Sequence, residues 1–353
     1  MKMRRFCTLG IIAVFAFLPL CSCKEELPEK VRMKKPHTQI LQSVDGETQG
    51  KKILLVHSYQ TGYPWVDAIT RGVRKILDGS GARLEIFYMD TKRNTAEAWK
   101  KRAGELAERK MKEHKPDVVI AADDNAQQYF AMKYVGRGIP FVFCGVNADP
   151  SKYGYPASNI TGIIERPHFK DTLEFLSELK NVRRIGMLSS DDETSIGAFN
   201  FMKEEFVDVK VTEWKLVGRF DDWKRAVYNF NDSVDAFGIY MYHTLKDENS
   251  PTSLDPAAVM SWTAAHAKVP TMGFFDFGIE DGLVAGFVES GFEHGEKAAK
   301  YALDILKGVP LASLPITEAN IGIRMVNRDA AFRLGIPLGP QVLKSSRVVS
   351  AKE

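Results

Sequence analysis

The sequence has none of the short motifs that mark the commonest nucleotide-binding and hydrolytic sites. It contains no G-x-G-x-x-G, no phosphate-binding loop, no G-x-S-x-G and no H-E-x-x-H. Asp90, Asp123 and Asp124 could still hold a cation, as in a phosphatase-like site. In that arrangement the key acid follows the first strand, where this chain has His57 and Ser58. The pattern favours a protein that is not an enzyme, and leaves a metal-dependent hydrolase as the third alternative.

Long apolar runs are scarce as well. Lys2, Arg4 and Arg5 precede an uncharged run over residues 6–20. This run is short for a membrane-spanning helix, which needs about 20 apolar residues. A basic start, a short apolar stretch and a small-residue end are typical of a signal peptide.

The signal ends in Leu20-Cys21-Ser22-Cys23, which resembles the lipobox of bacterial lipoproteins. The resemblance implies removal of residues 1–22 and lipid attachment to Cys23, which anchors the protein in the cell envelope in a periplasmic or extracytoplasmic location. Residues 23–50 are rich in Lys, Glu, Pro, Thr, Gln and Gly, which indicates a flexible tether. The alternatives are a cleaved signal with an incidental cysteine and an uncleaved anchor.

Cysteine is rare, with four in 353 residues. Cys7 and Cys21 leave with the signal and Cys23 carries the lipid, so only Cys144 remains available. This excludes a disulfide or a cysteine metal site within one mature chain, and we expect no metal and no cofactor.

Neither sign of charge is in excess. Without the three basic residues of the signal, the 48 Lys and Arg fall to 45 and equal the 45 Asp and Glu. The balance gives no indication of a nucleic-acid partner.

Residues 117–147 set the pattern of the folded part. An apolar run at 118–122, a helix-length segment and a second apolar run at 139–146 predict a β-α-β unit. Strands of this kind, joined by helices, form a parallel sheet covered on both faces. Strands at 53–56 and 82–90 and the helices after them extend this unit toward the N-terminus.

The alternation then starts again. After an extended connection at 159–169, strands are predicted at 183–190, 211–217, 235–243, 269–277 and 283–290, with helices between them, and an amphipathic helix at 291–308 follows. We therefore predict an α/β protein with two doubly wound parallel-sheet lobes and a cleft between them.

Polar and aromatic residues follow the predicted strands and should meet at the carboxyl edges of the sheets, where open parallel sheets bind ligands. Carboxylates there would bind an ammonium or hydroxyls, and rings would stack on a flat ligand. Asn125 is also placed to cap the helix that follows it. The alternative for each residue is a cap, a rim contact or simple solvation. The candidates are Ser58, Tyr59, Tyr63, Trp65, Asp123, Asp124, Asn125, Gly145 and Asn147 in the first lobe, and Ser190, Asp191, Tyr242, His243 and Asp276 in the second.

Several short segments, in this order along the chain, carry a resemblance to a known family. They are HSY at 57–59, YPW at 63–65, DDNA at 123–126, FCGVN at 143–147, GFEHG at 291–295 and VN at 326–327. Together they resemble the substrate-binding proteins of ABC transporters with the type I periplasmic-binding fold, in a branch that includes binders of aromatic amino acids.

The resemblance implies two lobes joined by a hinge. The expected division is 51–160 with 285–310 in the first lobe, 161–284 with 311–340 in the second, and a tail at 341–353. It also implies a small polar ligand, aromatic amino acids among the candidates, and an ABC permease as partner. The HSY, YPW and DDNA segments resemble sensory binding domains too, so a ligand-sensing subunit for a separate signalling receptor is the second alternative.

Overall fold

The computed structural model describes residues 46–205, 207–248, 250 and 252–350. The predicted signal peptide, Cys23 and most of the predicted tether lie outside this part of the chain. Within it, no helix combines the length and the apolarity needed to cross a membrane.

The first sheet is parallel throughout, in the order β11-β5-β4-β3-β1-β2. In this order the switch point lies between β1 and β3. The chain continues from β1 to one edge of the sheet, and from β3 toward the other edge. Its strands are β1 (Lys52–His57), β2 (Arg83–Tyr88), β3 (Val118–Ala122), β4 (Phe141–Val146), β5 (Ile160–Ile164) and β11 (Thr317–Glu318).

The second sheet repeats this plan in the order β13-β12-β10-β9-β8-β6-β7, with one antiparallel pair, β10 with β12. Its switch point lies between β6 and β8. The strands are β6 (Arg184–Ser190), β7 (Lys210–Val217), β8 (Ala236–Ile239), β9 (Thr271–Gly273), β10 (Ala285–Val288), β12 (Ile323–Asn327) and β13 (Arg347–Val349). Two α/β sheets of this kind confirm the predicted fold class.

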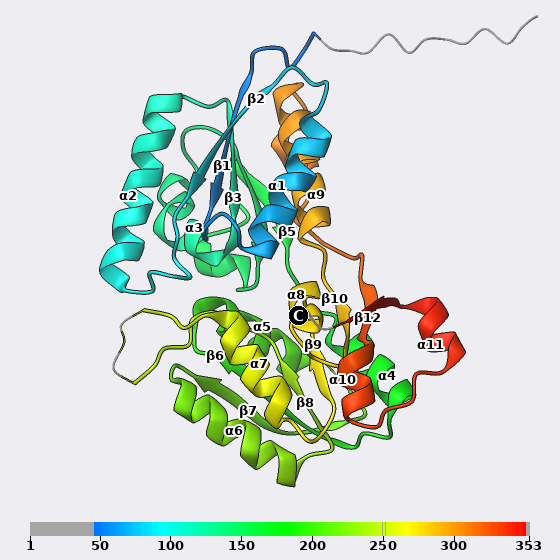
Figure 1. Cartoon of the computed structure of the whole chain (residues 1–353). Coiled ribbons are helices and arrows are strands. Elements are labelled where there is room, and N and C mark those ends of the chain that lie inside the picture. Colours follow the sequence, from blue (N-terminus) through cyan, green and yellow to red (C-terminus); the bar gives the residue numbers. More distant parts are fainter. Residues whose placement is uncertain (1–45, 206, 249, 251, 351–353) are drawn as a thin grey trace, which may run out of the picture. The chain divides into compact units, whose positions relative to one another are not determined.

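Helices cover both faces of each sheet, as Figure 1 shows for α1 and α9 on one side of the first sheet and α2 on the other. The first lobe has α1 (Pro64–Leu77), α2 (Glu97–His114), α3 (Asp123–Tyr129) and α9 (Gly291–Leu306). The second has α4 (Phe169–Leu179), α5 (Glu193–Glu204), α6 (Phe220–Ser233), α7 (Pro256–His266), α8 (Asp276–Glu280), α10 (Arg328–Arg333) and α11 (Pro340–Ser345). Short 3-10 turns are η1 (Ala131–Tyr134), η2 (Pro150–Tyr153) and η3 (Leu311–Ser313).

Glycines bring α1 and α9 into direct backbone contact. A Cβ on Gly72 would lie 2.1 Å from the carbonyl oxygen of Phe292, and one on Gly295 would lie 2.1 Å from that of Ile69. Real Cβ atoms do not approach backbone oxygens this closely, so both positions require glycine. The close packing fixes α9, although it comes late in the sequence, against a helix of the first lobe.

The chain passes between the two sheets three times, between β5 and α4, between β10 and α9, and between β11 and β12. We call residues 165–168, 289–290 and 319–322 the first, second and third crossovers. Backbone amides of Asn320 and Ile321 in the third crossover donate to the carboxylate of Glu293 on α9, at 3.1 and 2.8 Å. Three crossovers side by side form the hinge.

Strand pairing corrects the expected boundaries between the lobes. Residues 159–169 were expected to be a connection, yet β5 pairs with β4 inside the first sheet. The expected first lobe began its second segment at 285, but β10 pairs with β9 and β12 in the second sheet. β13 of the expected tail pairs with β12. The sequence of a short apolar strand does not indicate which sheet the strand joins. Its membership is known only from the strands with which it forms hydrogen bonds.

Candidate functional site

The carboxyl ends of the strands in the two sheets face each other across direct side-chain contacts. The hydroxyl of Tyr59, after β1, lies 2.7 Å from that of Thr194 on α5. The hydroxyl of Tyr63 lies 3.5 Å from the sulfur of Met241, after β8. Both tyrosines are buried, with 2% and 3% of their surface exposed. The predicted edges of the two sheets therefore meet.

Among the described residues, two ion pairs also join the lobes. The Lys92 ammonium, after β2, lies 3.2 Å from Oδ2 of Asp192 at the start of α5, and 4.7 Å from the centre of the Tyr59 ring. The Lys100 ammonium lies 2.6 Å from a carboxylate oxygen of Glu193. The side chains of Lys92 and Asp192 are only 3% and 10% exposed, so this pair is held largely away from water.

Burial alone would raise the pKa of Asp192, but its surroundings more than offset that effect. Lys92 and the backbone amide and hydroxyl of Ser195 all favour the carboxylate, and the net effect holds the pKa of Asp192 below its ordinary value of 3.8. Ser190 and Thr244 donate to the same carboxylate at 3.1 Å each. Asp192 is therefore a fixed negative charge at the edge of the second lobe.

A cleft of about 420 Å³ lies between the lobes at this edge. Its walls carry both charges and hydroxyls. They are Tyr59, Thr91, Lys92, Thr95, Lys100 and Asn125 from the first lobe, and Asp191, Asp192, Glu193, Thr194, Ile196, Gly218, Arg219, Thr244 and Lys246 from the second. Of the predicted site residues, Tyr59, Asn125 and Asp191 line it.

Aromatic side chains pack against each other between the lobes, beside the cleft. We call this group the aromatic cluster; its members are Tyr63, Trp65, Tyr240, Tyr242, His243, Phe275 and Phe277. The Tyr59 ring joins the cleft to this cluster through an edge contact with Tyr63 at 5.6 Å. Tyr63 contacts His243 at 4.8 Å, and Trp65 contacts Phe275 at 5.4 Å, each across the lobes. Four of its seven members were predicted from the sequence.

Asp123 lies beside this cluster in an unusual backbone conformation, with φ at 67°. Its Oδ1 accepts a 2.8 Å hydrogen bond from the indole N–H of Trp65, whereas its Oδ2 is buried without a partner. Burial and the neighbouring Glu165 carboxylate raise the pKa of Asp123 well above its ordinary value of 3.8. An unpartnered buried carboxyl oxygen is able to accept a hydrogen bond from a ligand.

Gly145 makes room for this carboxyl. It has φ at 65°, and a Cβ on it would lie 2.9 Å from Oδ1 of Asp123 and 3.5 Å from both Glu165 and Trp65. Glycine adopts this backbone conformation at no steric cost.

Asp124 differs from its neighbour. Its two oxygens accept hydrogen bonds from the backbone amides of Asn147 and Ala148, at 3.1 Å each, and from the hydroxyl of Tyr153 at 2.8 Å. The expectation that both aspartates face the cleft is therefore wrong for Asp124, whose carboxylate ties α3 to the loop after β4.

Ser58 and Asn125 also differ from expectation. The Ser58 hydroxyl accepts from the amide of Ala126 and donates to the carbonyl of Ala122, at 2.7 Å each, so it satisfies the start of α3. Asn125, expected to cap that helix, lies inside it and donates to Thr91 at 2.9 Å. Its Oδ1 is buried without a partner. Asn147 lies with its Oδ1 2.9 Å from the hydroxyl of Tyr240.

Some of the predicted residues of the second lobe lie at the cleft, and others are hydrogen-bonded within the protein. Ser190 is buried and directed toward Asp192, and Asp191 is exposed at the cleft. Tyr242 donates to Asp281 at 2.7 Å. Burial and the Lys92 charge lower the pKa of His243 to about 3, and its Nδ1 has no partner.

Asp276 accepts from the backbone amide of Phe277 at 2.8 Å, and burial raises its pKa.

The hydrolase alternative required Asp90 to join Asp123 and Asp124. Instead, the Asp90 carboxylate is paired with Arg93 at 2.7 Å. Among the described residues, these three acids do not come together as a group that could hold a metal ion.

Among the residues of the interlobe contacts that were not predicted as site residues are Lys92, Asp192, Thr194, Tyr240 and Glu165. The last four also follow strands, and a wider search of strand ends would have included them. Lys92 also follows a strand, β2, but the sequence around it gives no sign that this lysine is buried, with 3% of its surface exposed.

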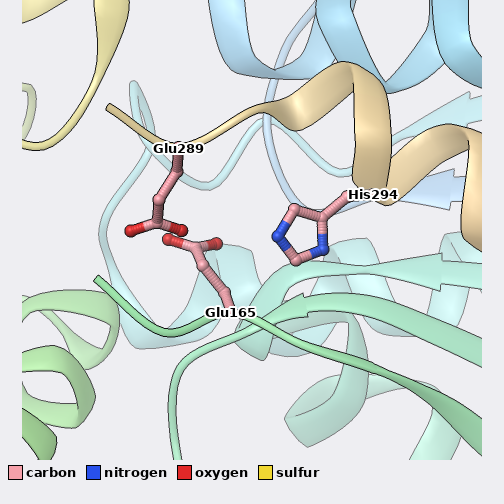
Figure 2. Close-up of side chains that lie close together, drawn as sticks. All are labelled: Glu165, Glu289 and His294. Carbon is pink, nitrogen blue, oxygen red and sulfur yellow. The ribbon is translucent and has the colours of Figure 1, made fainter. Parts of the chain in front are cut away.

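One group of side chains could hold a metal ion (Figure 2). One ligand atom from each of Glu165, Glu289 and His294 lies within 4.8 Å of the others, and all three residues are buried. Burial lowers the pKa of His294 to about 3 and raises that of Glu165 to about 8.

Comparisons with solved structures show the same fold. A conserved domain protein from Vibrio cholerae aligns with 21% identity, over 86% of this chain and all of its own, at a TM-score of 0.67. An ABC domain in complex with L-Trp from Streptococcus pneumoniae aligns with 18% identity, over 85% of this chain and all of its own, at a TM-score of 0.66. A ligand-free, open substrate-binding protein with adhesive properties from Clostridium difficile aligns with 18% identity, over 86% and 100%, at 0.61.

The sequence has no significant match among curated proteins. Residues 62–350 match the family described as ABC transporter substrate binding protein, whose members act outside the cytoplasm and are binding proteins rather than enzymes. Because the match covers most of the folded part, the chain belongs to the ABC transporter substrate-binding protein family.

Proposed function

We propose that this protein is a lipid-anchored solute-binding protein that captures a small polar ligand between its lobes and presents it to an ABC permease. Aromatic amino acids are the first candidates for the ligand. Family membership supports the transport role, and the complex of the Streptococcus pneumoniae protein with L-Trp supports the ligand class.

The observation that carries the proposal is the unpartnered Oδ2 of Asp123 beside the aromatic cluster. The carboxyl would accept hydrogen bonds from a ligand ammonium, and charge-assisted bonds of this kind are among the stronger ones. Tyr63 and Trp65 from the first lobe, with Phe275 and Phe277 from the second, would contact a flat ring. Aromatic pairs contribute about 0.5–1.5 kcal/mol beyond their burial.

Ligand binding would act by stabilising the contacts between the lobes. A ligand favours the closed arrangement only as far as it binds that arrangement more tightly than the open one. A ligand that contacts Asp123 on one side and Tyr240 or Phe277 on the other meets this condition, because the two sides come from different lobes. The permease would then recognise the closed lobes.

Lipid attachment at Cys23 would keep the protein at the membrane that holds its permease. This part of the proposal stands on the Leu20-Cys21-Ser22-Cys23 motif after a short apolar run. Residues 24–50 would give the folded lobes reach from the surface.

Thermal unfolding of the full-length protein against amino acids, nucleosides and sugars tests ligand binding. A ligand present at 100 times its dissociation constant adds about 2.7 kcal/mol to stability. We expect aromatic amino acids to raise the unfolding temperature, and Trp65→Ala and Asp123→Asn to abolish the rise. Asp232→Asn, on the exposed side of α6, is the matched control and should keep it.

A rise that survives both Trp65→Ala and Asp123→Asn would place the ligand elsewhere and contradict the proposal. The sensory alternative binds ligand in the same way, so it is separated by the partner. Co-purification of the liganded protein with a permease supports transport, and co-purification with a signalling receptor contradicts it.

A further inference from the structure

Two buried glutamates face each other in the hinge, away from the residues of the cleft wall. Glu165 is the first residue of the first crossover and Glu289 the first of the second, so they come from segments 124 positions apart in the sequence. His294, in the first turn of α9, directs its ring toward both (Figure 2). One ligand atom of each lies within 4.8 Å of the other two.

These groups have few partners for their polar atoms. Glu165, Glu289 and His294 are 2%, 6% and 0% exposed. Both carboxylate oxygens of Glu289 and Nε2 of His294 are buried without a hydrogen bond. The Tyr240 hydroxyl lies 2.9 Å from Oε1 of Glu165, and the Asn147 side chain also favours the charged form of this carboxyl.

No basic side chain in the described part of the chain forms an ion pair with either glutamate. The positive charge of Arg166 acts on Glu289 and favours its carboxylate, but the guanidinium donates its hydrogen bonds to the carbonyls of Val146, Asn147 and Glu165 and to neither carboxylate. Two carboxylates this close and this deeply buried are costly without a compensating positive charge.

We propose that Glu165, Glu289 and His294 bind a divalent metal ion of the zinc class, which ties the first and second crossovers to α9. Glu165 would bind through Oε2, since Oε1 faces Tyr240. Glu289 would supply one oxygen and His294 its Nε2. Three protein ligands leave a fourth position for water, as in many tetrahedral zinc sites.

The imidazole selects the class of metal. Zinc accepts nitrogen and carboxylate oxygen together, whereas calcium takes six to eight oxygen ligands and magnesium keeps several waters. The Tyr240 hydroxyl would orient the Glu165 carboxylate from the second coordination shell. The proposal therefore predicts preference for zinc over calcium.

Metal binding also has a local consequence at Gly145. Its amide lies 3.3 Å from Nδ1 of His294, which fits a ring that carries its proton on Nε2. With a metal on Nε2 the proton moves to Nδ1, and the Gly145 amide loses its acceptor. The amide resonance of Gly145 should therefore shift when the metal binds.

The site would control the hinge rather than the ligand. The first turn of α9 already holds the third crossover through Glu293. A metal on His294 would add the other two crossovers to the same turn, and α9 is fixed to α1 by glycine contacts. The bound metal would then restrict opening of the lobes.

Isothermal titration of zinc chloride into the EDTA-treated, dialysed full-length protein at pH 7.5 tests the site. We expect one zinc per chain and at least tenfold weaker binding of calcium. Glu289→Gln and His294→Asn should each weaken zinc binding at least tenfold, whereas Glu105→Gln, on the exposed face of α2, should not. Should one variant fail to fold, Glu165→Gln takes its place. Zinc should also shift the Gly145 amide resonance in the wild type and not in His294→Asn.

Absence of saturable zinc binding would overturn the proposal, as would binding that all of these variants retain. A Glu289→Gln protein that is more stable than the wild type, in a chain that binds no zinc, would show that protons balance the two carboxylates instead. The titration uses metal alone, so its outcome is independent of whether an amino acid binds in the cleft.

Discussion

Replacing Asp123 by Asn should stabilise the protein while it removes ligand binding. The Asn oxygen can still accept from the Trp65 indole, as Oδ1 of Asp123 does at 2.8 Å. The amide group takes the place of an oxygen that has no partner, and it removes a negative charge close to Glu165. Proteins keep such costly groups where a ligand uses them, so stability and binding should change in opposite directions.

The size of the gain follows from the buried negative charge that the substitution removes, because the N–H₂ group of Asn would lie in the same unpartnered position as the oxygen that it replaces. A buried polar group without a hydrogen bond costs about 1–3 kcal/mol, and more when it is charged. The pKa of Asp123 is raised in the folded protein, so the folded state is penalised at pH values above the unfolded pKa of about 3.9. The gain from the substitution should be close to zero at pH 4 and should grow to about 1–3 kcal/mol as the pH rises to 7.5.

Urea unfolding at pH 4 and pH 7.5, with EDTA present, measures this difference. Asp124→Asn is the matched control, because Asp124 accepts three hydrogen bonds from the protein. One of these donors would face the new amide group, and hydrogen bonds to charged groups contribute about 1.5–3 kcal/mol each. Burial raises the pKa of Asp124 too, so its substitution also removes a penalised charge but loses a hydrogen bond, and Asp124→Asn should stabilise less than Asp123→Asn. Loss of stability in Asp123→Asn at pH 7.5 would refute the reasoning.

Three further predictions concern the contacts that hold the structure together. Lys92→Met breaks a buried ion pair between the lobes, and breaking such a pair costs about 3 kcal/mol. Ligand affinity measured by calorimetry should therefore fall up to about 100-fold. Unchanged affinity would contradict the role of the pair. Because the pKa of Asp192 is lowered in the folded protein, its contribution to stability is present above about pH 4 and is lost as the pH falls further. X-ray scattering of the liganded wild type should therefore show the lobes opening below pH 4. If Asp192→Asn opened with the same pH midpoint, Asp192 would not be the group that controls opening. Gly72→Ala places a methyl group against the carbonyl of Phe292 and should destabilise the protein by about 1–3 kcal/mol in urea unfolding. Gly339→Ala, just before α11, provides a comparison without that contact, because φ there is −65° and no atom lies within 4 Å of an added Cβ.

The two sheets could be predicted because each depends on local patterns. Runs such as Val118–Ala122 are apolar throughout, which is typical of strands buried on both faces. Repetition of strand and helix then requires parallel neighbours. The membership of short strands could not be predicted, since β5 and β10 are equally apolar and differ only in which chain segments lie beside them.

The candidate site was harder to predict than the fold. In the structure Tyr59 and His243 make contacts between the lobes and Asp123 lies beside the aromatic cluster, but position after a strand does not distinguish a free carboxyl from a bonded one. Asp123 and Asp124 are identical residues at adjacent positions, and the amides that bind Asp124 belong to a loop more than 20 residues away. The same limit applies to Ser58, whose partner Ala126 lies beyond the next β-α unit.

The atoms without partners suggest how an empty protein would avoid closing. Oδ2 of Asp123, Oδ1 of Asn125 and Nδ1 of His243 are all buried at the strand ends that face across the lobes. In an open arrangement water would satisfy them, whereas closure without ligand removes that water and leaves each unpaired, at a cost of about 1–3 kcal/mol per group. The interlobe contacts of Tyr59, Lys92 and Lys100 act in the opposite direction. A ligand that supplies hydrogen bonds to even two of these atoms would remove several kcal/mol from the cost of closure, which is enough to move the balance from mostly open to mostly closed.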